Sequence, residues 1–272
     1  MISFIGAGPG APDLLTLRAA ERLAAADVVV WAASLVPGEV LAGCRPDVVL
    51  HESARMTLEE ITAVFAAHPD AAIVRLHSGD PTIYSAIAEQ IDWCRRAGRD
   101  YEIVPGVSSV TATAAALGRE LTVPGVAQTV VLTRLAYRTA ASVPERESVA
   151  ELARRGATMA LFLSAARPEA LQAELLCAGS AYVADTPAVL AYHVSWPDEQ
   201  IVVSTVGALV EDLAALGHRA SVLILVGDAL ADAEVPACSH VYAAEYGHAF
   251  REAQPGGKAQ PAGDGSQSGA AG

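Results

Sequence analysis

The sequence predicts an α/β protein of two α/β/α domains, with a mostly parallel N-terminal sheet, a mixed C-terminal sheet and an active-site cleft between them. In the first half, short apolar runs alternate with helical patterns, which is typical of a parallel sheet covered by helices on both faces. After Gly118 the pattern changes, and a second set of apolar runs follows. Because ligand pockets favour clefts between domains, we expect the functional site there.

The N-terminal domain is expected to span residues 1–119. Its predicted strands are Ile2–Gly6, Asp27–Trp31, Val48–His51, Ala72–Leu76 and Glu102–Val104. Its predicted helices are Leu14–Ala25, Leu58–Ala67 and Ile83–Ala97. Aromatic residues are few and Ala, Val and Leu are common, as expected of near-continuous apolar strands in a parallel sheet.

The C-terminal domain is expected to span residues 120–250. Its predicted strands are Val130–Thr133, Thr158–Phe162, Pro187–His193, Ile201–Thr205 and Ser221–Val226, and its predicted helices are Pro168–Leu176 and Gly207–Leu216. Residues 251–272 are mostly Gly, Ala, Gln, Pro and Ser, a composition that cannot bury a core. We therefore expect this tail to be disordered.

Charge and composition limit the function classes. A formal net charge of −13 argues against a nucleic-acid partner, because such partners require a basic surface. The apolar stretches are too short to cross a bilayer, and no basic segment precedes the first of them, so we expect a cytoplasmic protein without a membrane partner. The four cysteines show neither a CxxC pair nor a zinc-like spacing, which favours free thiols and no metal site; they are Cys44, Cys94, Cys177 and Cys238.

The first strand ends in a glycine- and proline-rich turn, Gly6-Ala7-Gly8-Pro9-Gly10-Ala11-Pro12, before a predicted helix. Such a turn lets the backbone approach a ligand closely, and the helix start leaves N–H groups for polar atoms. Gly6, Gly8 and Ala11 match a dinucleotide-binding fingerprint. However, Pro9 and Pro12 remove donors that a pyrophosphate needs, and Asp27 precedes the second strand instead of following it. Dinucleotide binding is therefore the weaker alternative.

Two later segments also follow strands. In Ser78-Gly79-Asp80-Pro81, Gly79 can adopt unusual backbone angles and Asp80 can accept hydrogen bonds. In Pro105-Gly106-Val107-Ser108-Ser109, the two hydroxyl groups are the polar features. Each segment has a structural alternative, because Asp80 and the serines could simply cap the helices that follow.

Taken together, these segments resemble the tetrapyrrole (class III) methyltransferases, which use S-adenosylmethionine. The family's marks are a G-x-G-P-G turn with a Leu-Leu-Thr helix, a G-D-P loop and a P-G-[IV]-[ST]-[SA] segment, and all three occur here in order. The resemblance covers about residues 1–230. It implies two α/β domains, a homodimer and a methyl donor bound in the cleft between the domains.

The resemblance also implies a donor pocket, position by position. Its residues would be Pro9, Ser78, Gly79, Asp80, Ile83, Ser108, Ser109, Leu163, Ala191 and Val222. Adenosylmethionine has an apolar adenine, ribose hydroxyls and a zwitterionic end, and backbone groups of glycine-rich loops suit such a ligand. Asp80 is the expected polar anchor, either as well as or instead of being a helix cap.

Three further segments resemble the precorrin-4 C11-methyltransferase branch, which acts in cobalamin biosynthesis. They are Glu52–Glu60 (S-A-R-M-T-L-E-E after the first residue), Thr133–Glu145, and Tyr192–Glu199 (Y-H-V-S-W-P-D-E). The second departs from the branch's pattern, since the spacing between Thr139 and Pro144 is longer than expected. Its role is accordingly less defined than that of the other two.

The donor's sulfonium methyl is already activated, so transfer to ring carbon 11 would be a direct displacement that requires alignment more than acid–base chemistry. No residue is singled out as a general base. The tetrapyrrole substrate carries many carboxylates, for which Arg55, Arg119, Arg134 and Arg138 are candidates, each with a solvated surface role as the alternative. His77 and His193 flank the loops, and a structural role is favoured over a catalytic one for both.

Several alternatives stay open. The substrate could carry cobalt, or the methylated position could be C17, C20 or that of the uroporphyrinogen step. Diphthine synthases and ribosomal RNA methylases share the fold, but the Tyr192–Glu199 segment argues against both. From other classes, an NAD-binding oxidoreductase and a catalytically silent tetrapyrrole carrier are possible.

Overall fold

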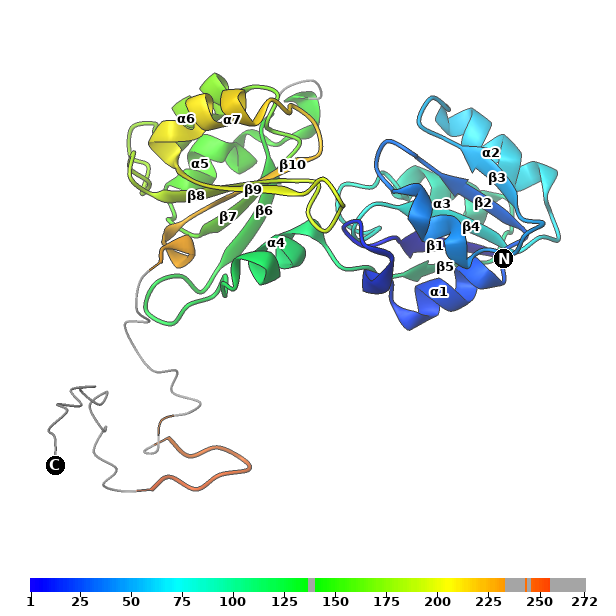
Figure 1. The fold of residues 1–272 in the computed structure, drawn as a ribbon, viewed down its shortest axis with the longest axis horizontal. Helices are drawn as coiled ribbons and strands as arrows, with labels where there is room; N and C mark the ends of the chain where they lie inside the picture. The colour runs from blue at the N-terminus through cyan, green and yellow to red at the C-terminus, as the bar shows by residue number, and fades with distance from the viewer. Residues whose placement is uncertain (137–139, 233–242, 244–245, 255–272) are drawn as a thin grey trace, which may run out of the picture.

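The computed structural model describes residues 1–136, 140–232, 243 and 246–254. It contains two five-stranded sheets, one in each half of the chain and each covered by helices (Figure 1). The prediction of an α/β protein with a parallel N-terminal sheet and a mixed C-terminal sheet is confirmed.

The first sheet consists of β1 (Ile2–Gly6), β2 (Val28–Trp31), β3 (Val49–Glu52), β4 (Ile73–His77) and β5 (Tyr101–Val104). The strand order is β3-β2-β4-β1-β5, and all neighbours run parallel. Strand β1 therefore lies between β4 and β5, so the loops that follow these three strands emerge side by side. At such a switch in strand order, α/β sheets bind their ligands.

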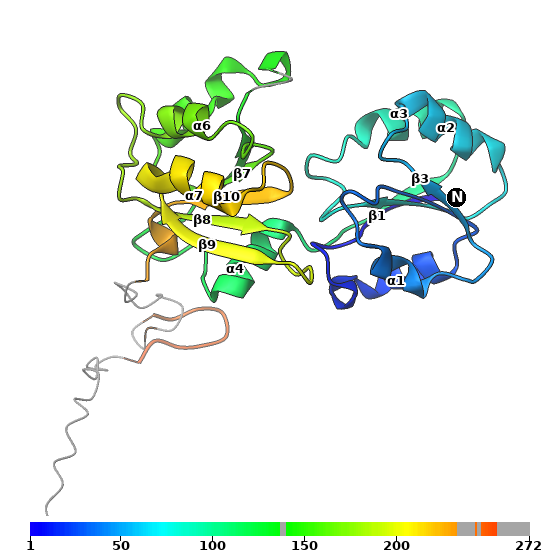
Figure 2. The ribbon, with the colours of Figure 1, turned by 45° about the horizontal axis from the view of Figure 1, so that its top comes forward.

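Helices cover both faces of the first sheet (Figure 2). On one face, α1 (Leu17–Ala24) packs Leu23 against Val29 and Leu76. On the other face, α2 (Leu58–Ala67) and α3 (Ala88–Arg96) pack against Phe4 and its neighbours. Thr57 starts α2 with a capping box that includes Glu60, which explains why the predicted bounds of this helix are confirmed.

Two predicted helix starts were wrong. The helix expected from Ile83 begins at Ala88, because Tyr84 and Ala86 have φ angles of 53° and 49°, which are incompatible with a right-handed helix. The helix expected from Leu14 is a 3₁₀ turn, Pro12–Leu14, followed by α1, which starts at Leu17 after its cap Thr16.

The second sheet consists of β6 (Val130–Arg134), β7 (Thr158–Phe162), β8 (Pro187–Tyr192), β9 (Gln200–Thr205) and β10 (Val222–Val226). Its order is β6-β7-β10-β8-β9, with only the β6–β7 pair parallel. One face is covered by α5 (Val149–Ala153), α6 (Pro168–Leu175) and α7 (Leu209–Leu216). The short helix α5 was not predicted, and α7 begins two residues later than Gly207.

Helix α4 (Ser109–Leu117) connects the two halves of the structure. It follows β5 of the first sheet, yet its Val110 packs with Leu223 and Leu225 on the second sheet. The helix therefore covers the face opposite to α5–α7, and the expected boundary at residue 120 falls after it. In the described part of the chain, no helix is long and apolar enough to cross a membrane. Most of the expected tail, from residue 255 onward, lies outside the described residues.

Strand β4 carries two buried polar side chains, Arg75 and His77, on the face toward α2 and α3. Arg75 donates to the carbonyl of Val30 at 3.2 Å and to the hydroxyl of Ser53 at 3.0 Å. Within the described residues, His77 Nε2 has no hydrogen-bond partner. Burial, together with the charge of Arg75, lowers the pKa of His77 to about 3, so this imidazole stays neutral at ordinary pH.

We predict that His77 makes the folded protein sensitive to mild acid. In the unfolded chain this histidine has a pKa of about 6.5, whereas in the folded chain its pKa is about 3. Between these two pH values the unfolded chain binds one more proton than the folded chain, so acidification stabilises the unfolded state. Urea unfolding from pH 7 to pH 4.5 should show a loss of up to about 1.4 kcal/mol per pH unit from this group. His77→Phe should flatten that dependence, whereas the exposed His248→Gln should keep it. An equal slope in wild type and His77→Phe would contradict the prediction.

Candidate functional site

Three glycine-containing loops meet at the carboxyl ends of β1, β4 and β5. Gly8 and Gly79 form an antiparallel bridge, in which the N–H of Gly79 donates to the carbonyl of Gly8 at 2.8 Å. A side-chain carbon added to Gly6 would lie 2.6 Å from Cα of Gly106 and 2.5 Å from the carbonyl oxygen of Gly79. One added to Gly106 would also overlap that oxygen. The three loops therefore pack backbone to backbone, which only glycine allows.

Asp80 connects the loop after β4 to the loop after β5. Its Oδ2 accepts from the N–H of Gly106 at 3.0 Å, and its Oδ1 accepts from the N–H and the hydroxyl of Thr82 at 2.8 and 2.5 Å. Partial burial raises the pKa of the carboxyl, but the hydrogen bonds from Thr82 and Gly106 outweigh burial and leave the pKa below its usual value. The helix-cap alternative for Asp80 is wrong, because α3 begins only at Ala88. The side chain instead fixes a turn and a neighbouring loop.

The structure places the other predicted donor-pocket residues on both halves of the molecule. Pro9 is buried, Ser78 is exposed and Ile83 is half-buried. Ser108 does cap α4, since its hydroxyl accepts from the N–H of Val110 at 3.3 Å, and Ser109 is the first residue of that helix. The cap alternative is thus confirmed for Ser108, and a donor contact for it stays a prediction.

On the second sheet, the predicted pocket residues come from three adjacent strands. Ala191 in β8 and Val222 in β10 are buried, and their strands pair with Ala191 opposite Leu223. Leu163 follows directly after β7, whose predicted bounds Thr158–Phe162 are confirmed. Its φ is 52° and it is 72% exposed, so it offers an apolar side chain that no core element covers. Such an exposed leucine in a strained backbone suits an apolar ligand group.

Tyr84 forms one of two bridges between the halves. Its ring centroid lies 5.1 Å from that of Phe162 at the end of β7, and its hydroxyl donates to the carbonyl of Leu132 at 3.4 Å. Its left-handed backbone directs the side chain out of the loop after β4. This role was missed in the sequence analysis, because no local pattern marks Tyr84 as a contact to strands β6 and β7.

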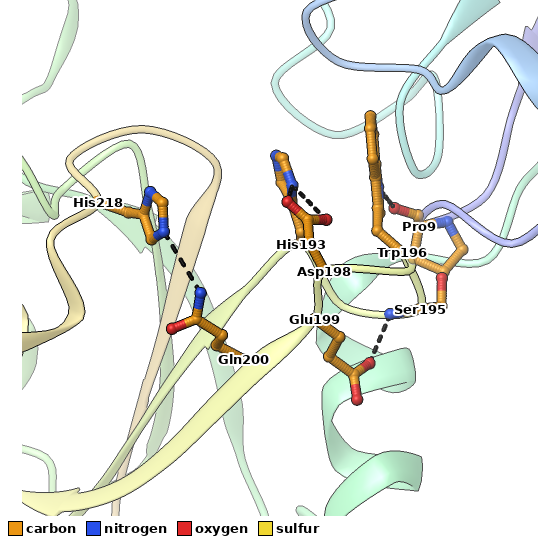
Figure 3. A network of polar contacts seen from close by, with 8 residues as sticks. All are labelled: Pro9, His193, Ser195, Trp196, Asp198, Glu199, Gln200 and His218. Atoms are coloured by element: carbon orange, nitrogen blue, oxygen red, sulfur yellow. Dashed lines mark hydrogen bonds and ion pairs between the residues drawn. The ribbon is translucent and has the colours of Figure 1, made fainter.

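The loop of residues 192–199, which joins β8 to β9, forms the other bridge (Figure 3). The indole N–H of Trp196 donates to the carbonyl of Pro9 at 2.8 Å, and Ser195 Oγ accepts from the N–H of Ala11 at 2.9 Å. These residues were expected only as marks of a branch within a family. The structure shows that they touch the first glycine loop.

His193 lies in the same loop. Its ring stacks on those of Tyr192 and Trp196, at centroid distances of 3.8 and 4.3 Å. Its Nδ1 lies 3.0 Å from Oδ1 of Asp198 (Figure 3). His193 is thus held by stacked rings and by a hydrogen bond to Asp198, and His77 is held by burial. The structural role favoured for both stays a prediction.

The predicted substrate arginines lie in different places. Arg55 is exposed in the turn between β3 and α2, and Arg119 pairs with Asp232 at 2.5 Å. Arg134 ends β6, donates to Ser142 Oγ at 2.6 Å and lines a pocket of about 260 Å³ that also includes Tyr84 and Glu147. Arg138 lies outside the described residues.

The described cysteines Cys44, Cys94 and Cys177 are free thiols, as expected, and Cys238 lies outside the described residues. Within the described residues, no group of three or more His, Cys, Asp or Glu side chains could hold a metal ion. The polar groups of the site are therefore backbone amides and carbonyls, one carboxylate, hydroxyls and an indole.

This combination of fold and loops has a counterpart among known proteins. Residues 1–210 match the model of the tetrapyrrole (corrin/porphyrin) methylases, and the chain belongs to this family. The resemblance found in the sequence is thereby confirmed, and the protein is a methyltransferase.

Individual relatives are similar over most of their length. The precorrin-4 C(11)-methyltransferase of Rhodococcus erythropolis is 44% identical over 89% of this chain and 96% of its own. The cobalt-precorrin-4 C(11)-methyltransferase of Methanocaldococcus jannaschii is 40% identical over 92% and 96%. Among solved structures, a cobalt precorrin-4 methyltransferase is 43% identical with a TM-score of 0.80, covering 85% of this chain and 95% of its own.

Another solved structure, which is less similar to this chain in sequence, carries a ligand. The uroporphyrin-III C-methyltransferase of Thermus thermophilus complexed with S-adenosylhomocysteine is 25% identical with a TM-score of 0.70, covering 84% of this chain and 98% of its own. The family match, which is shared by a protein that binds a methyl-donor product, favours the methylase interpretation of the first loop over the dinucleotide interpretation.

We predict that the three-glycine contact does not tolerate a methyl group. Gly106→Ala should lower the free energy of unfolding by at least about 1–3 kcal/mol, because the new carbon overlaps backbone that cannot move aside like a side chain. Urea denaturation measures the change. Gly38→Ala is the matched control, since an added carbon there meets nothing within 4 Å and should cost little. Equal losses in the two variants would contradict the prediction.

We predict that Asp80→Asn weakens the connection between the loop after β4 and the loop after β5. An amide has one acceptor atom and cannot serve both Gly106 and Thr82, so stability at pH 7 should fall by about 1–3 kcal/mol. Because the pKa of Asp80 is lowered in the folded state, its contribution exists above about pH 4 and is lost on acidification. The difference between wild type and variant should therefore shrink toward pH 3. The exposed Asp70→Asn is the control, and a pH-independent difference would argue against the carboxylate.

Proposed function

We propose that this protein transfers a methyl group from S-adenosylmethionine to C11 of precorrin-4, a step toward the corrin ring of cobalamin. The observation that carries the proposal is the set of relatives named precorrin-4 C(11)-methyltransferase, 39–44% identical over most of both chains. Proteins so similar over nearly their whole length share the substrate-facing segments as well as the fold.

The residues of the first sheet suit the donor. The loops after β1, β4 and β5 are packed backbone to backbone, so their amides and carbonyls lie together at the carboxyl ends of these strands, where they would bind the polar groups of the donor. Pro9, Gly79 and Asp80 would hold its polar end there. Leu163, Ala191 and Val222 provide an apolar side for the adenine, and Leu163 is already exposed to receive it.

The protein's contribution to the reaction is alignment. The donor supplies an activated sulfonium methyl, so the chain must hold the acceptor carbon in line with it and exclude water. Fixing two reactants in this way supplies roughly 7–11 kcal/mol of the barrier. Loops that are packed backbone to backbone and tied by Asp80 have little freedom to move, which suits this task.

Arg134 is the best placed of the candidate arginines for the substrate's carboxylates. It borders the 260 Å³ pocket together with Tyr84, which itself bridges the two halves. A guanidinium can bind a carboxylate through two parallel hydrogen bonds. Arg55, Arg119 and Arg138 stay predictions on the grounds of the sequence alone.

Two assignments stand beside the main one. The cobalt-containing substrate is the second candidate, because relatives acting on cobalt-precorrin-4 are 40–45% identical, no less than the others. The uroporphyrinogen step is less favoured, since its relative from Pseudomonas aeruginosa is only 31% identical. We also propose that the protein is a cytoplasmic homodimer, as the resemblance implies.

We predict turnover of precorrin-4 with ¹³C-methyl adenosylmethionine. Carbon NMR of the product should show the label on C11, because the alignment described above selects one ring carbon. Precorrin-4 and its cobalt complex should be supplied separately, and the faster reaction identifies the natural substrate. Uroporphyrinogen III is the control and should not be methylated. Label on another carbon, or binding of NADH in place of S-adenosylhomocysteine, would contradict the proposal.

A further inference from the structure

The loop of residues 192–199 belongs to the second half of the structure but holds the first loop of the first half. Ser195 and Trp196, which we call the clamp residues, each make one hydrogen bond to that loop. Ser195 accepts from the N–H of Ala11. Trp196 donates to the carbonyl of Pro9, as Figure 3 shows. Both distances, 2.9 and 2.8 Å, are those of well-formed hydrogen bonds.

The position of Trp196 also explains why residue 10 is a glycine. A side-chain carbon added to Gly10 would lie 2.5 Å from Nε1 of Trp196 and closer still to its Cδ1, and the three nearest atoms all belong to this indole. Gly10 does not have a positive φ, so its backbone would accept alanine. The residue is therefore glycine because the indole lies against it.

The loop of residues 192–199 is held in one conformation by contacts among its own residues. His193 and Ser195 have φ angles of 46° and 67°, a left-handed conformation that is strained for residues with a side chain and persists only where the surroundings impose it. The N–H of Ser195 donates to Glu199 Oε2 at 2.6 Å, and the N–H of Trp196 donates to the carbonyl of His193 at 2.8 Å. Asp198 holds the ring of His193. The loop thus presents Ser195 and Trp196 in one defined geometry.

Four stacked rings connect this loop to the second sheet. From His218 to Tyr192, His193 and Trp196, successive centroids lie 3.6, 3.8 and 4.3 Å apart, with interplanar angles of 2° to 18°. Tyr192 ends β8 and pairs with Val222 in β10. The clamp residues are therefore anchored on the two strands that carry Ala191 and Val222.

We propose that Ser195 and Trp196 are positioning residues for the methyl donor. Pro9 lies on the first half of the predicted donor pocket, and Ala191 and Val222 lie on the second. The clamp joins the halves, so that an adenosyl ligand meets both at once. This inference rests on the proposed function, because it assumes that the pocket takes an adenosyl sulfonium or thioether.

The first test removes one hydrogen bond and keeps an aromatic ring. Trp196→Phe should weaken S-adenosylhomocysteine binding by about 3- to 10-fold in calorimetric titration, the effect of one neutral hydrogen bond, and Ser195→Ala should act similarly. At saturating donor, kcat and the KM for the tetrapyrrole should change by less than about twofold. Trp93→Phe is the matched control, because Trp93 packs on Phe65 at the α2–α3 side, and it should bind like wild type.

The second test uses Gly10. Gly10→Ala should weaken S-adenosylhomocysteine binding by at least about 10-fold in the wild type, since the indole must leave its place. In a Trp196→Ala background, the same change should have less than about a twofold further effect, because the obstacle is gone. Contacting residues show such non-additivity, whereas independent ones do not.

The outcomes separate the two proposals. Failure of the wild type to bind S-adenosylhomocysteine would overturn the proposed function, and the clamp with it. Wild-type binding that Trp196→Phe and Ser195→Ala leave unchanged would overturn the clamp alone, and so would equal effects of Gly10→Ala in both backgrounds. A lower melting temperature with unchanged ligand affinity would make the loop purely structural, which also overturns the inference.

Discussion

The contact of Gly6, Gly79 and Gly106 is the constraint on which the site depends. Three chain segments from β1, β4 and β5 meet where there is no room for a side chain, and Asp80 then ties two of them with a charged hydrogen bond. The strand order β4-β1-β5 brings these segments together, and the bare backbone makes the meeting point suitable for a small polar molecule. Substituted glycines would force the loops apart and leave the carboxylate without its partner.

The second half of the molecule completes this arrangement from outside. Tyr84 reaches from the first half to Leu132 in β6 and to Phe162 at the end of β7, and the loop of residues 192–199 reaches back to Pro9 and Ala11. One bridge is thus made by a side chain of the first half and the other by a loop of the second half. Both halves therefore contribute to the predicted donor pocket.

The strands could be predicted from the sequence to within about a residue or two, because each is a short apolar run bounded by turn residues. The helix expected at Ile83 could not be predicted correctly, because Asp80-Pro81 has the pattern of a helix start. Tyr84 and Ala86 instead have left-handed backbones, and Tyr84 contacts a distant sheet. The glycine loops were recognisable as ligand loops. The bond from Asp80 to Gly106, and the clamp on Pro9, join residues far apart in sequence, and no local pattern reports such a pairing.

The parallel strand order of the first sheet also determines when each strand can find its partner while the chain is being synthesised. Strand β1 is made first, but Ile2 pairs with Ile73 and Tyr101, so the strand has no partner until β4 has left the ribosome and lacks its second partner until β5 follows. Helix α4 follows at once, and its Val110 belongs to the core of a sheet not yet made. The half-made chain therefore exposes an apolar helix face until β10 arrives, and apolar surface exposed in this way favours aggregation of the unfinished chain.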